Sequence, residues 1–310
     1  MKVTAKAHPN IALVKYFGKK DSKNVLPYND SLSITWEGLE TVTSIEPADG
    51  FYFLMNGKDA SSEDKAKVNA FLSRFSKAPL NVLIRSTNNF PTAAGLASSA
   101  SAFAALSVAA NRYFACDFDK QTLETITRKG SGSAIRSLYG GANRFNRDGH
   151  VTHVDASLED YRLFVILVDD SKKALSSREA MKRVVRTSPL YKAFVNHANE
   201  HVSLLSDALV KEDFTKVGSI SEENALAMHG AMLAANPPIR FMNDASFAAI
   251  RLVDALKHEG FEVFYTMDAG PNVKMITKSR DADSLKKRAS KAGFTILGPF
   301  KPSKEGARLI

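Results

Sequence analysis

Cysteine is nearly absent from this sequence: Cys116 is the only one among 310 residues. A single cysteine excludes an intrachain disulfide framework, and this usage is typical of a reducing compartment, so we expect a cytoplasmic protein. Cys116 lies at the end of an apolar helical pattern, where a thiol is more often packed than reactive.

Long hydrophobic runs are absent as well. No stretch of 18 consecutive apolar residues occurs, which excludes a membrane-spanning helix, and the first ten residues lack the apolar segment of a signal peptide. The sequence contains neither the G-x-x-x-x-G-K-[ST] phosphate loop nor the G-x-S-x-G elbow of many hydrolases. Hydrophobic residues still make up 44% of the chain, which suffices for a core in one large or two moderate domains.

The charge is unbalanced, with a formal net charge of +9. A basic chain can bind nucleic acid, an anionic membrane surface or small polyanions. The Lys and Arg residues are spread along the chain, and the densest group, at 286–291, falls in a predicted amphipathic helix and is typical of a solvated face. We therefore expect small anionic ligands, and neither nucleic acid nor a membrane as partner.

Short β-branched runs and helical patterns alternate in the first half of the chain, whereas four helical patterns fill residues 176–257. This order predicts an α+β fold with an N-terminal domain over residues 1–170 and a C-terminal α+β domain over residues 171–310. The predicted strands are 11–14, 32–35, 41–45, 51–55, 82–85, 151–154, 163–168, 262–267, 273–277 and one near 294–297. The predicted helices of the first half are 63–75, 99–114, 120–129 and a short one near 133.

The most informative stretch leads from a short apolar strand into an Ala-rich helix. Pro91 blocks continuation of the strand, Gly95 relaxes the backbone, and Ser98 or Ser99 can cap the helix. Nearly every side chain from Thr92 to Ala102 is small. Such a turn presents free N–H groups and the positive end of the helix dipole to a phosphate, although a tight turn before a packed helix has the same pattern.

A second group of residues suited to anions follows the predicted strand 11–14. Lys15 and Lys19 would project to one side of a continued strand and Tyr16 to the other, whereas a bend at Gly18 would bring all three into one cleft. A diphosphate requires such cations, but solvated surface lysines are the commoner case.

Two further stretches have both structural and functional interpretations. The turn K-G-S-G-S-A at 129–134 offers hydroxyls and N–H groups, and it precedes Arg136, which can bind a carboxylate or a phosphate through two hydrogen bonds. Asp268 ends an alternating strand before a Gly-Pro turn, where an aspartate is by default a turn former. Ser176 and Ser177 are typical helix caps.

Five segments together resemble the GHMP kinase superfamily, in the version found in diphosphomevalonate decarboxylases. They occur in the family's order and span nearly the whole chain. The resemblance implies two α+β lobes with an active site in the cleft between them, and a homodimer. The segments are N-I-A-L-V-K-Y-F-G-K at 10–19, P-T-A-A-G-L-A-S-S at 91–99, S-G-S-A-I-R-S-L-Y-G at 131–140, K-A-L-S-S-R at 173–178 and M-D-A-G-P-N at 267–272.

The resemblance also implies roles for individual residues. The catalytic residues would be Asp268, Lys15 and Arg136. The substrate-binding residues would be Tyr16, Phe17, Gly18, Lys19, Ser131, Gly132, Ser133, Ala134, Ile135, Arg136, Ser177 and Arg178. The nucleotide-binding residues would be Pro91, Thr92, Ala93, Ala94, Gly95, Leu96, Ala97, Ser98, Ser99 and Lys173. This chain has Phe17 where the family usually has a tryptophan. The replacement keeps an aromatic wall and removes an indole N–H.

The implied reaction is ATP-dependent decarboxylation of (R)-5-diphosphomevalonate to isopentenyl diphosphate through 3-phosphorylation, in the mevalonate pathway. Asp268 would position the 3-hydroxyl or accept its proton, Lys15 would neutralise the phosphoryl group and Arg136 would orient the leaving carboxylate. No motif predicts an all-protein metal site, so Mg²⁺ is expected to accompany ATP, through Ser98 or Ser99.

Two alternatives from the same superfamily are a mevalonate-type 3-kinase and a phosphomevalonate decarboxylase. The coexistence of Lys15, Arg136 and Asp268 favours decarboxylation over phosphorylation alone, and two cation-rich segments favour a diphosphate over a monophosphate. His197 and His201 lie four apart in a predicted helix, a spacing that can bind zinc. No H-E-x-x-H motif supplies a third ligand, so we interpret them as part of a half-exposed helix face.

Overall fold

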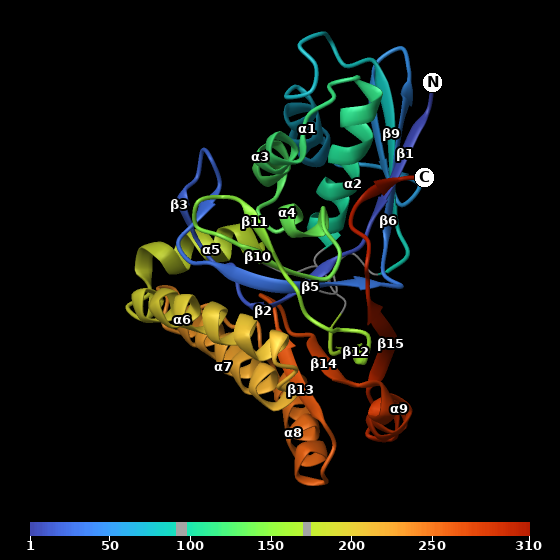
Figure 1. Cartoon of the computed structure of the whole chain (residues 1–310). Helices are drawn as coiled ribbons and strands as arrows, with labels where there is room; N and C mark the ends of the chain where they lie inside the picture. Colours follow the sequence, from blue (N-terminus) through green and yellow to red (C-terminus); the bar gives the residue numbers. More distant parts are fainter. Residues whose placement is uncertain (91–97, 170–174) are drawn as a thin grey trace.

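The computed structural model describes residues 1–90, 98–169 and 175–310. The predictions for residues 91–97 and for Lys173 lie outside the described residues. Two mixed layers of sheet and helix lie one above the other in Figure 1, and the cleft discussed below opens between them. Among the described residues, no helix is both long and apolar enough to cross a membrane.

The first sheet has the strand order β16-β1-β6-β9-β7-β8. Helices α1 (Ser62–Leu72) and α2 (Ser98–Tyr113) pack on it, and α3 (Lys120–Gly130) and α4 (Ala134–Ser137) lie beside α2. The core between sheet and helices contains Ile45, Ile84, Phe71 and Phe103. The strands are β1 (Val3–Ala7), β6 (Thr41–Pro47), β7 (Phe51–Met55), β8 (Lys58–Asp59), β9 (Val82–Asn88) and β16 (Arg308–Leu309).

The second sheet has the order β11-β10-β5-β15-β12-β14-β13, and β2 pairs with β5. Its strands alternate between two cores, because successive side chains of a strand point to opposite faces. Phe264 and Ile276 face one core, whereas Tyr265 and Met275 face the other. The strands are β2 (Asn10–Val14), β5 (Ser31–Glu37), β10 (Ala142–Phe145), β11 (Val151–Val154), β12 (Tyr161–Leu167), β13 (Val263–Met267), β14 (Val273–Lys278) and β15 (Thr295–Pro302), and a separate ribbon pairs β3 (Lys19–Asp21) with β4 (Leu26–Pro27).

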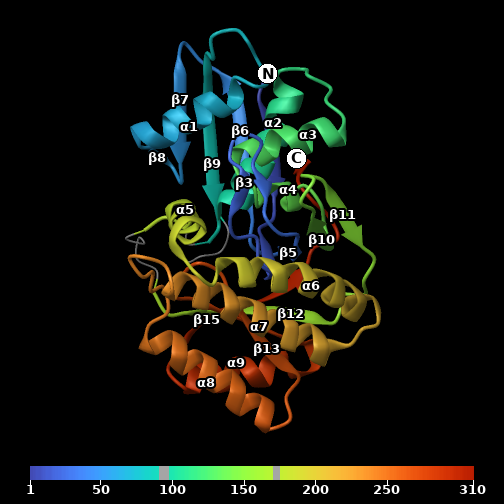
Figure 2. The same ribbon diagram turned by 90° about the vertical axis from the view of Figure 1, so that its left-hand side faces the viewer.

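Helices cover both faces of this second sheet, as Figure 2 shows. On one face lie α5 (Ser177–Thr187), α6 (Tyr191–Val210) and α7 (Phe214–Leu233). On the other face lie α8 (Asp244–His258) and α9 (Ala282–Lys291). The predicted cap at Ser176 is confirmed by a capping box with Glu179 before α5, and a second capping box, Asn243 with Ser246, begins α8.

The α+β class and most predicted elements are confirmed, with element ends shifted by a few residues. Strands β1 and β10 and the short strands β3, β4, β8 and β16 were not predicted from the sequence. Strands β1 and β10 pair with neighbouring strands but contain small or polar residues. Neither segment of the sequence therefore shows a strong apolar pattern. The division of the chain at residue 170 stays a prediction, and β12, which precedes it, pairs with β14 and β15 of the second half.

Candidate active site

A cleft of about 850 Å³ lies where the two layers meet. Among the described residues that line it are seven cationic side chains and a single carboxylate, Asp268. The cations are Lys15, Lys19, Lys67, Lys129, Arg136, Arg178 and Lys182. A concave site with this charge balance suits a ligand that carries several negative charges.

Asp268 lies at the tip of a hairpin in the second sheet. Strand β13 ends at Met267 and β14 begins at Val273, so the turn 268–272 places the aspartate at the rim of the sheet. Its Oδ1 is 3.1 Å from Nζ of Lys15, and its Oδ2 is 3.3 Å from Nζ of Lys274. The carboxylate therefore makes an ion pair through each oxygen, while 27% of the side chain remains exposed to the cleft.

A bend after strand β2 brings the N-terminal cations into the cleft. The strand ends at Val14, and Gly18 has φ of +119°, a conformation that L-residues rarely adopt. Lys15, Tyr16 and Lys19 all line the cleft, as the bend at Gly18 predicts. Phe17 also lines the cleft, but it is buried and packs into the core of the second layer against Phe194 of α6.

Arg136 enters the cleft from the short helix α4, and only 2% of the residue is exposed. Its Nε donates to Asn10 at 3.2 Å, and one Nη donates to the Ser31 hydroxyl. Asn10 in turn donates to the Ser137 hydroxyl at 2.8 Å and to the Ser133 carbonyl at 3.0 Å. These neutral partners fix the orientation of the guanidinium without cancelling its charge, so the charge is available to an anion in the cleft.

The two predicted anion-binding turns meet through their hydroxyl groups. The first turn of α2 contains Ser98 and Ser99, and the Ser99 hydroxyl lies 3.4 Å from that of Ser131, which lies 3.1 Å from that of Ser133. Gly132 allows Tyr16 to approach this turn, since a Cβ at that position would lie 2.6 Å from the Tyr16 hydroxyl. The cleft thus joins both turns to Asp268, the arrangement on which the predicted chemistry depends.

The remaining substrate-binding predictions fall in the same region. Ser177 and Arg178, in the first turn of α5, line the cleft, whereas Ala134 and Ile135 are buried behind it. The Tyr16 hydroxyl is buried and has no hydrogen-bond partner among the described residues. An unsatisfied hydroxyl at a cleft wall is a donor that a bound anion can use.

Burial and mutual repulsion set the protonation of the cleft residues. Burial would raise the pKa of Asp268, but Lys15 and Lys274 hold that pKa well below its usual range. Burial lowers the pKa of Lys15 to about 8, in spite of the attraction of Asp268. Burial and the charges of Arg178, Lys182 and Lys67 lower the pKa of Lys19 to about 8 as well. Cations that repel one another in this way are stabilised when an anion arrives.

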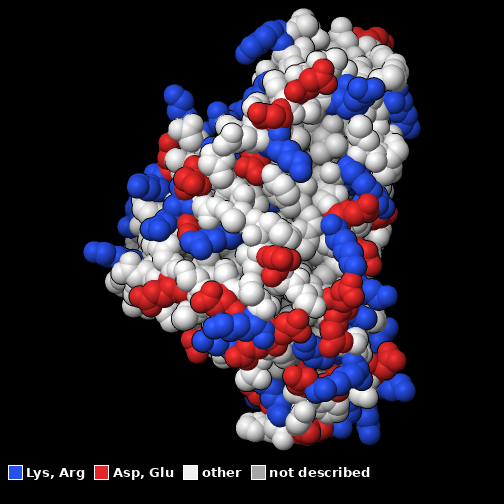
Figure 3. All heavy atoms as spheres, viewed as in Figure 1, with Lys and Arg blue, Asp and Glu red and all other residues white. Residues whose placement is uncertain are grey.

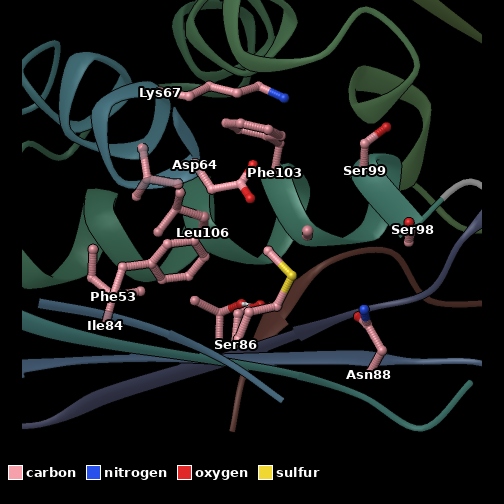
Figure 4. A pocket seen from close by; sticks show the side chains of 14 residues that line it. Phe53, Asp64, Lys67, Ile84, Ser86, Asn88, Ser98, Ser99, Phe103 and Leu106 are labelled. Carbon is pink, nitrogen blue, oxygen red and sulfur yellow. Dashed lines mark hydrogen bonds between the residues drawn. The ribbon is translucent and has the colours of Figure 1, made fainter. Parts of the chain in front are cut away.

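A smaller apolar pocket, of about 170 Å³, lies between α1, α2 and the first sheet. Figure 4 shows Phe103 and Leu106 of α2 facing Phe53 and Ile84 of the strands, with Lys67 and Ser99 near its edge. Lys67, Ser98 and Ser99 line both this pocket and the charged cleft. An apolar recess beside a cationic cleft matches a ligand that has a flat apolar part and a polyanionic part.

Several residues of this region carry no signal in the sequence that would identify them. Lys274 follows the Gly-Pro turn in a strand that looks purely structural, and its contact with Asp268 depends on the hairpin register. Lys67 and Lys182 are lysines of amphipathic helices and carry no motif. Asn10 is within a matched segment but shows its role only through its contact with Arg136.

His197 and His201 lie on the side of α6 that approaches α7, where they contact Glu223. His201 Nε2 is 3.4 Å and His197 Nε2 is 4.0 Å from a Glu223 oxygen, and the three candidate ligand atoms lie within 4.8 Å of one another. The separation of 3.4 Å matches the roughly 3.3 Å between ligands of a tetrahedral zinc site, whereas that of 4.0 Å exceeds it. His201 is buried rather than half-exposed, and burial lowers its pKa. We interpret the group as a polar contact between helices.

The surface carries both signs of charge. Figure 3 shows Lys and Arg interspersed with Asp and Glu over the face it presents, without one continuous basic area. Several of these residues form exposed ion pairs, such as Lys304 with Glu159 and Arg288 with Glu259. The charges on this face thus include both signs, whereas the described lining of the cleft has seven cations and one carboxylate.

Comparison with known families gives a consistent result over both halves of the chain. Residues 7–157 match the diphosphomevalonate decarboxylase-like N-terminal domain, and residues 163–294 match the mevalonate 5-diphosphate decarboxylase C-terminal domain. The chain is 35% identical to diphosphomevalonate decarboxylase of Saccharomyces cerevisiae over 85% of this chain and 74% of that protein. It is 31% identical to the protein of the same name from Homo sapiens, over 89% of this chain and 76% of that one.

Solved structures extend the likeness to the whole fold. Mevalonate diphosphate decarboxylase of Staphylococcus aureus has a TM-score of 0.92 and 31% identity, over 100% of this chain and 98% of that one. A structure described as MDDEF in complex with MVAPP, AMPPCP and magnesium has a TM-score of 0.91 and 33% identity, over 100% and 99%. The GHMP kinase-like fold predicted from the sequence is confirmed, and the chain belongs to the diphosphomevalonate decarboxylase family.

Proposed function

We propose that the cleft converts mevalonate 5-diphosphate to isopentenyl diphosphate through a 3-phosphorylated intermediate. As a member of its family the protein is an ATP-dependent decarboxylase that acts on mevalonate diphosphate in the mevalonate pathway. The observation that carries the finer proposal is the position of Asp268, a lone carboxylate between two lysines where both serine turns open into a cationic cleft.

The first proposed step transfers the γ-phosphoryl group of ATP to the 3-hydroxyl of the substrate. Asp268 accepts a hydrogen bond from that hydroxyl and aims its lone pair at the phosphorus. A carboxylate with so low a pKa is a weak base. We therefore assign to Asp268 first the orientation of the 3-hydroxyl and only later the acceptance of its proton, when the forming O–P bond has made that proton acidic. Lys15 contacts the same carboxylate and is placed to neutralise charge on the transferring group.

The second proposed step removes the new phosphate group and then carbon dioxide. Departure of the tertiary phosphate leaves positive character at C3, and the electron pair of the breaking C–C bond becomes the double bond of the product. Ionised Asp268 lies where it can stabilise that positive character. Arg136, held by Asn10 and Ser31, binds and orients the carboxylate that leaves.

The diphosphate of the substrate is assigned to the cations at the entrance of the cleft. Lys19, Arg178 and the Tyr16 hydroxyl face the same space, together with the Ser131–Ser133 turn. The lowered pKa of Lys19 reflects burial first and then repulsion by the neighbouring cations, and two phosphate groups would relieve that repulsion. The same density of positive charge favours a diphosphate over a monophosphate.

ATP is assigned to the region where the apolar pocket and the charged cleft join. The base would occupy the recess that Phe103 and Leu106 line, and the phosphates would pass Ser98, Ser99 and Lys67. The predicted loop 91–97 and Lys173 would complete this site. One similar structure is of a complex with AMPPCP and magnesium, which supports an ATP-binding role.

The residues present fit Mg²⁺ bound mainly by nucleotide phosphates. Mg²⁺ prefers oxygen ligands and keeps several waters, and the hydroxyls of Ser98, Ser99 and Ser131 are oxygen donors beside the proposed phosphate path. Asp268 is engaged by two lysines and is not assigned as a ligand. When bound, the ion supplies charge neutralisation to the phosphates.

A coupled assay of the purified protein tests this proposal. With ATP, Mg²⁺ and mevalonate 5-diphosphate, we expect one ADP, one phosphate and one carbon dioxide per turnover. ADP without carbon dioxide would identify a 3-kinase, and faster turnover of mevalonate 5-phosphate would identify a phosphomevalonate decarboxylase. Either result would contradict the proposal.

Three further features are proposals of the same kind. We infer a cytoplasmic protein, because its one cysteine, Cys116, is half-buried and packs at the edge of the first core.

We infer a functional division of the chain near residue 170, which separates the N-terminal site segments from Asp268. We also infer a homodimer by analogy with the family. Analytical ultracentrifugation tests the homodimer.

A further inference from the structure

We propose that Lys274 is a positioning residue that holds the carboxylate of Asp268 in its working orientation and fixes its charge. This inference deepens the proposed function, because it concerns the residue on which that function rests. Nothing in the sequence patterns singles out Lys274, which lies in the middle of a buried strand.

The geometry separates the two lysines that contact Asp268. Lys15 lines the cleft and approaches Oδ1, so it can touch a substrate. Lys274 approaches Oδ2 from within the second sheet, is 0% exposed and does not line the cleft. Lys274 therefore acts on the reaction only through Asp268.

The hairpin register determines this contact. Lys274 pairs with Thr266 across β13 and β14, and side chains of such a pair lie on the same face of the sheet. Asp268 follows Thr266 by two residues and continues on that face. Strand β14 is paired on both sides, with β13 at Thr266 and with β12 at Val165. The backbone of the sheet consequently holds the Lys274 ammonium beneath the carboxylate.

A buried ammonium requires compensation, and the partners of Lys274 are few. Its Nζ lies 3.3 Å from Asp268 Oδ2 and 3.4 Å from the backbone carbonyl of Asn272. The ion pair with Asp268 is the one carboxylate contact that the described residues provide to it. A buried pair of this kind need not stabilise the fold, but removal of one partner leaves a costly unpaired charge.

Charged and titratable groups face Asp268 from four sides. Lys15 follows β2, Lys274 lies on β14 and Arg136 lies on α4. His229 of α7 contacts the Asp268 backbone carbonyl through Nε2 at 3.1 Å, and burial lowers the pKa of His229 to about 4, so that ring is neutral at neutral pH. Lys274 is the cation in this group that lies behind the carboxylate rather than beside the substrate.

The first test is a stability cycle that needs no enzymatic activity. Asp268→Asn should lower Tm, because it leaves Lys274 and Lys15 buried without a counter-ion. Adding Lys274→Met to that variant should raise Tm again, because it removes one of the two unpaired charges. Lys278→Met is the matched control, since Lys278 is on the same strand and face but pairs with Asp160. If Lys274→Met lowers Tm in the Asp268→Asn background as Lys278→Met does, the proposal is wrong.

The second test measures the carboxylate and the reaction in Lys274→Met itself. We expect the Asp268 pKa, followed by carbon-13 NMR of labelled aspartate, to rise by about one unit or more, since an opposite charge nearby lowers a carboxyl pKa by 1–3 units. The kcat should fall about tenfold or more, while the KM for mevalonate 5-diphosphate changes by less than about threefold, as expected for a residue that does not touch substrate.

The results separate this inference from the proposed function. An unchanged Asp268 titration, or a raised KM with normal kcat, would overturn the role of Lys274. If the wild-type protein released no carbon dioxide, the proposed function would fail, while the stability cycle and the NMR titration would still decide whether Lys274 fixes the charge of Asp268.

Discussion

The charged cleft and the apolar pocket share an edge but are built in opposite ways. Among the residues that the structure describes, seven cations and one carboxylate line the cleft, and they come from both layers of the molecule. The pocket is lined mainly by side chains of one layer, such as Phe53, Ile84 and Leu106. Apolar burial is non-directional and supplies affinity, whereas fixed charges act where charge changes during a reaction. We therefore expect the cleft to control turnover and the pocket to control nucleotide binding.

The largest expected effect is that of Asp268→Asn. Turnover should fall to below about a thousandth of the wild-type value, because the neutral amide neither orients the hydroxyl as an acceptor nor stabilises positive charge. Nucleotide binding, measured by calorimetry on protein shown to be folded, should stay nearly normal. Asp283→Asn, at an exposed position of α9, is the control. Retention of most of the activity would refute the catalytic assignment.

Arg136→Ala should have the next largest effect. Loss of the guanidinium should reduce kcat by about 10² or more, since a charge-assisted contact that orients the leaving carboxylate is worth several kcal/mol. Steady-state release of carbon dioxide measures it. Arg251→Ala, at an exposed position of α8, controls for the loss of an arginine. A near-normal rate would mean that Arg136 does not contact the leaving group.

The pH dependence of substrate binding should reveal the repelling lysines. Lys15 and Lys19 have pKa values of about 8, and each is cationic below that value. The kcat/KM for mevalonate 5-diphosphate should therefore have its maximal value below pH 8 and fall as the pH rises through 8. Lys19→Arg should move this decline to higher pH, because a guanidinium stays charged. A flat profile up to pH 9.5 would contradict the proposed diphosphate site.

The apolar pocket should respond through affinity alone. Ala102 lies on its wall, so Ala102→Phe should fill the recess and raise the KM for ATP about tenfold or more. The kcat at saturating ATP and the binding of mevalonate 5-diphosphate should change little. If the variant instead lowered kcat at saturation, the separation of roles between pocket and cleft would not hold.

The smallest effect is expected for a charge pair outside both sites. Lys304 and Glu159 form an ion pair but are both largely exposed. Exposed pairs are screened by solvent and contribute little. Lys304→Ala should leave Tm and kcat/KM unchanged within error, measured beside the wild type. A clear loss of activity would show that surface charge matters more than burial in this protein.

Local patterns predicted most of the helices and strands, because strand alternation, helix periodicity and helix caps depend on residues that are close together in the sequence. They also left two arrangements open for Lys15, Tyr16 and Lys19, and the bend at Gly18 is the one that the structure has. They could not reveal Lys274, whose importance depends on strand register, nor the wall of the apolar pocket, where Phe53 comes from a strand and Leu106 from a helix. The segment matches named the site residues, but periodicity alone gave no reason to prefer Asp268 to any other turn aspartate.

The sequence separation of the two lysine partners has a consequence for folding. Lys274 is joined to Asp268 by a single hairpin turn, whereas Lys15 contacts the same aspartate across 253 residues. Hairpins close in microseconds, and contacts between distant parts of a chain form late. We therefore expect the aspartate to gain its inner counter-ion during local assembly, and the reactive side of the cleft to be completed when the N-terminal strand joins the second sheet.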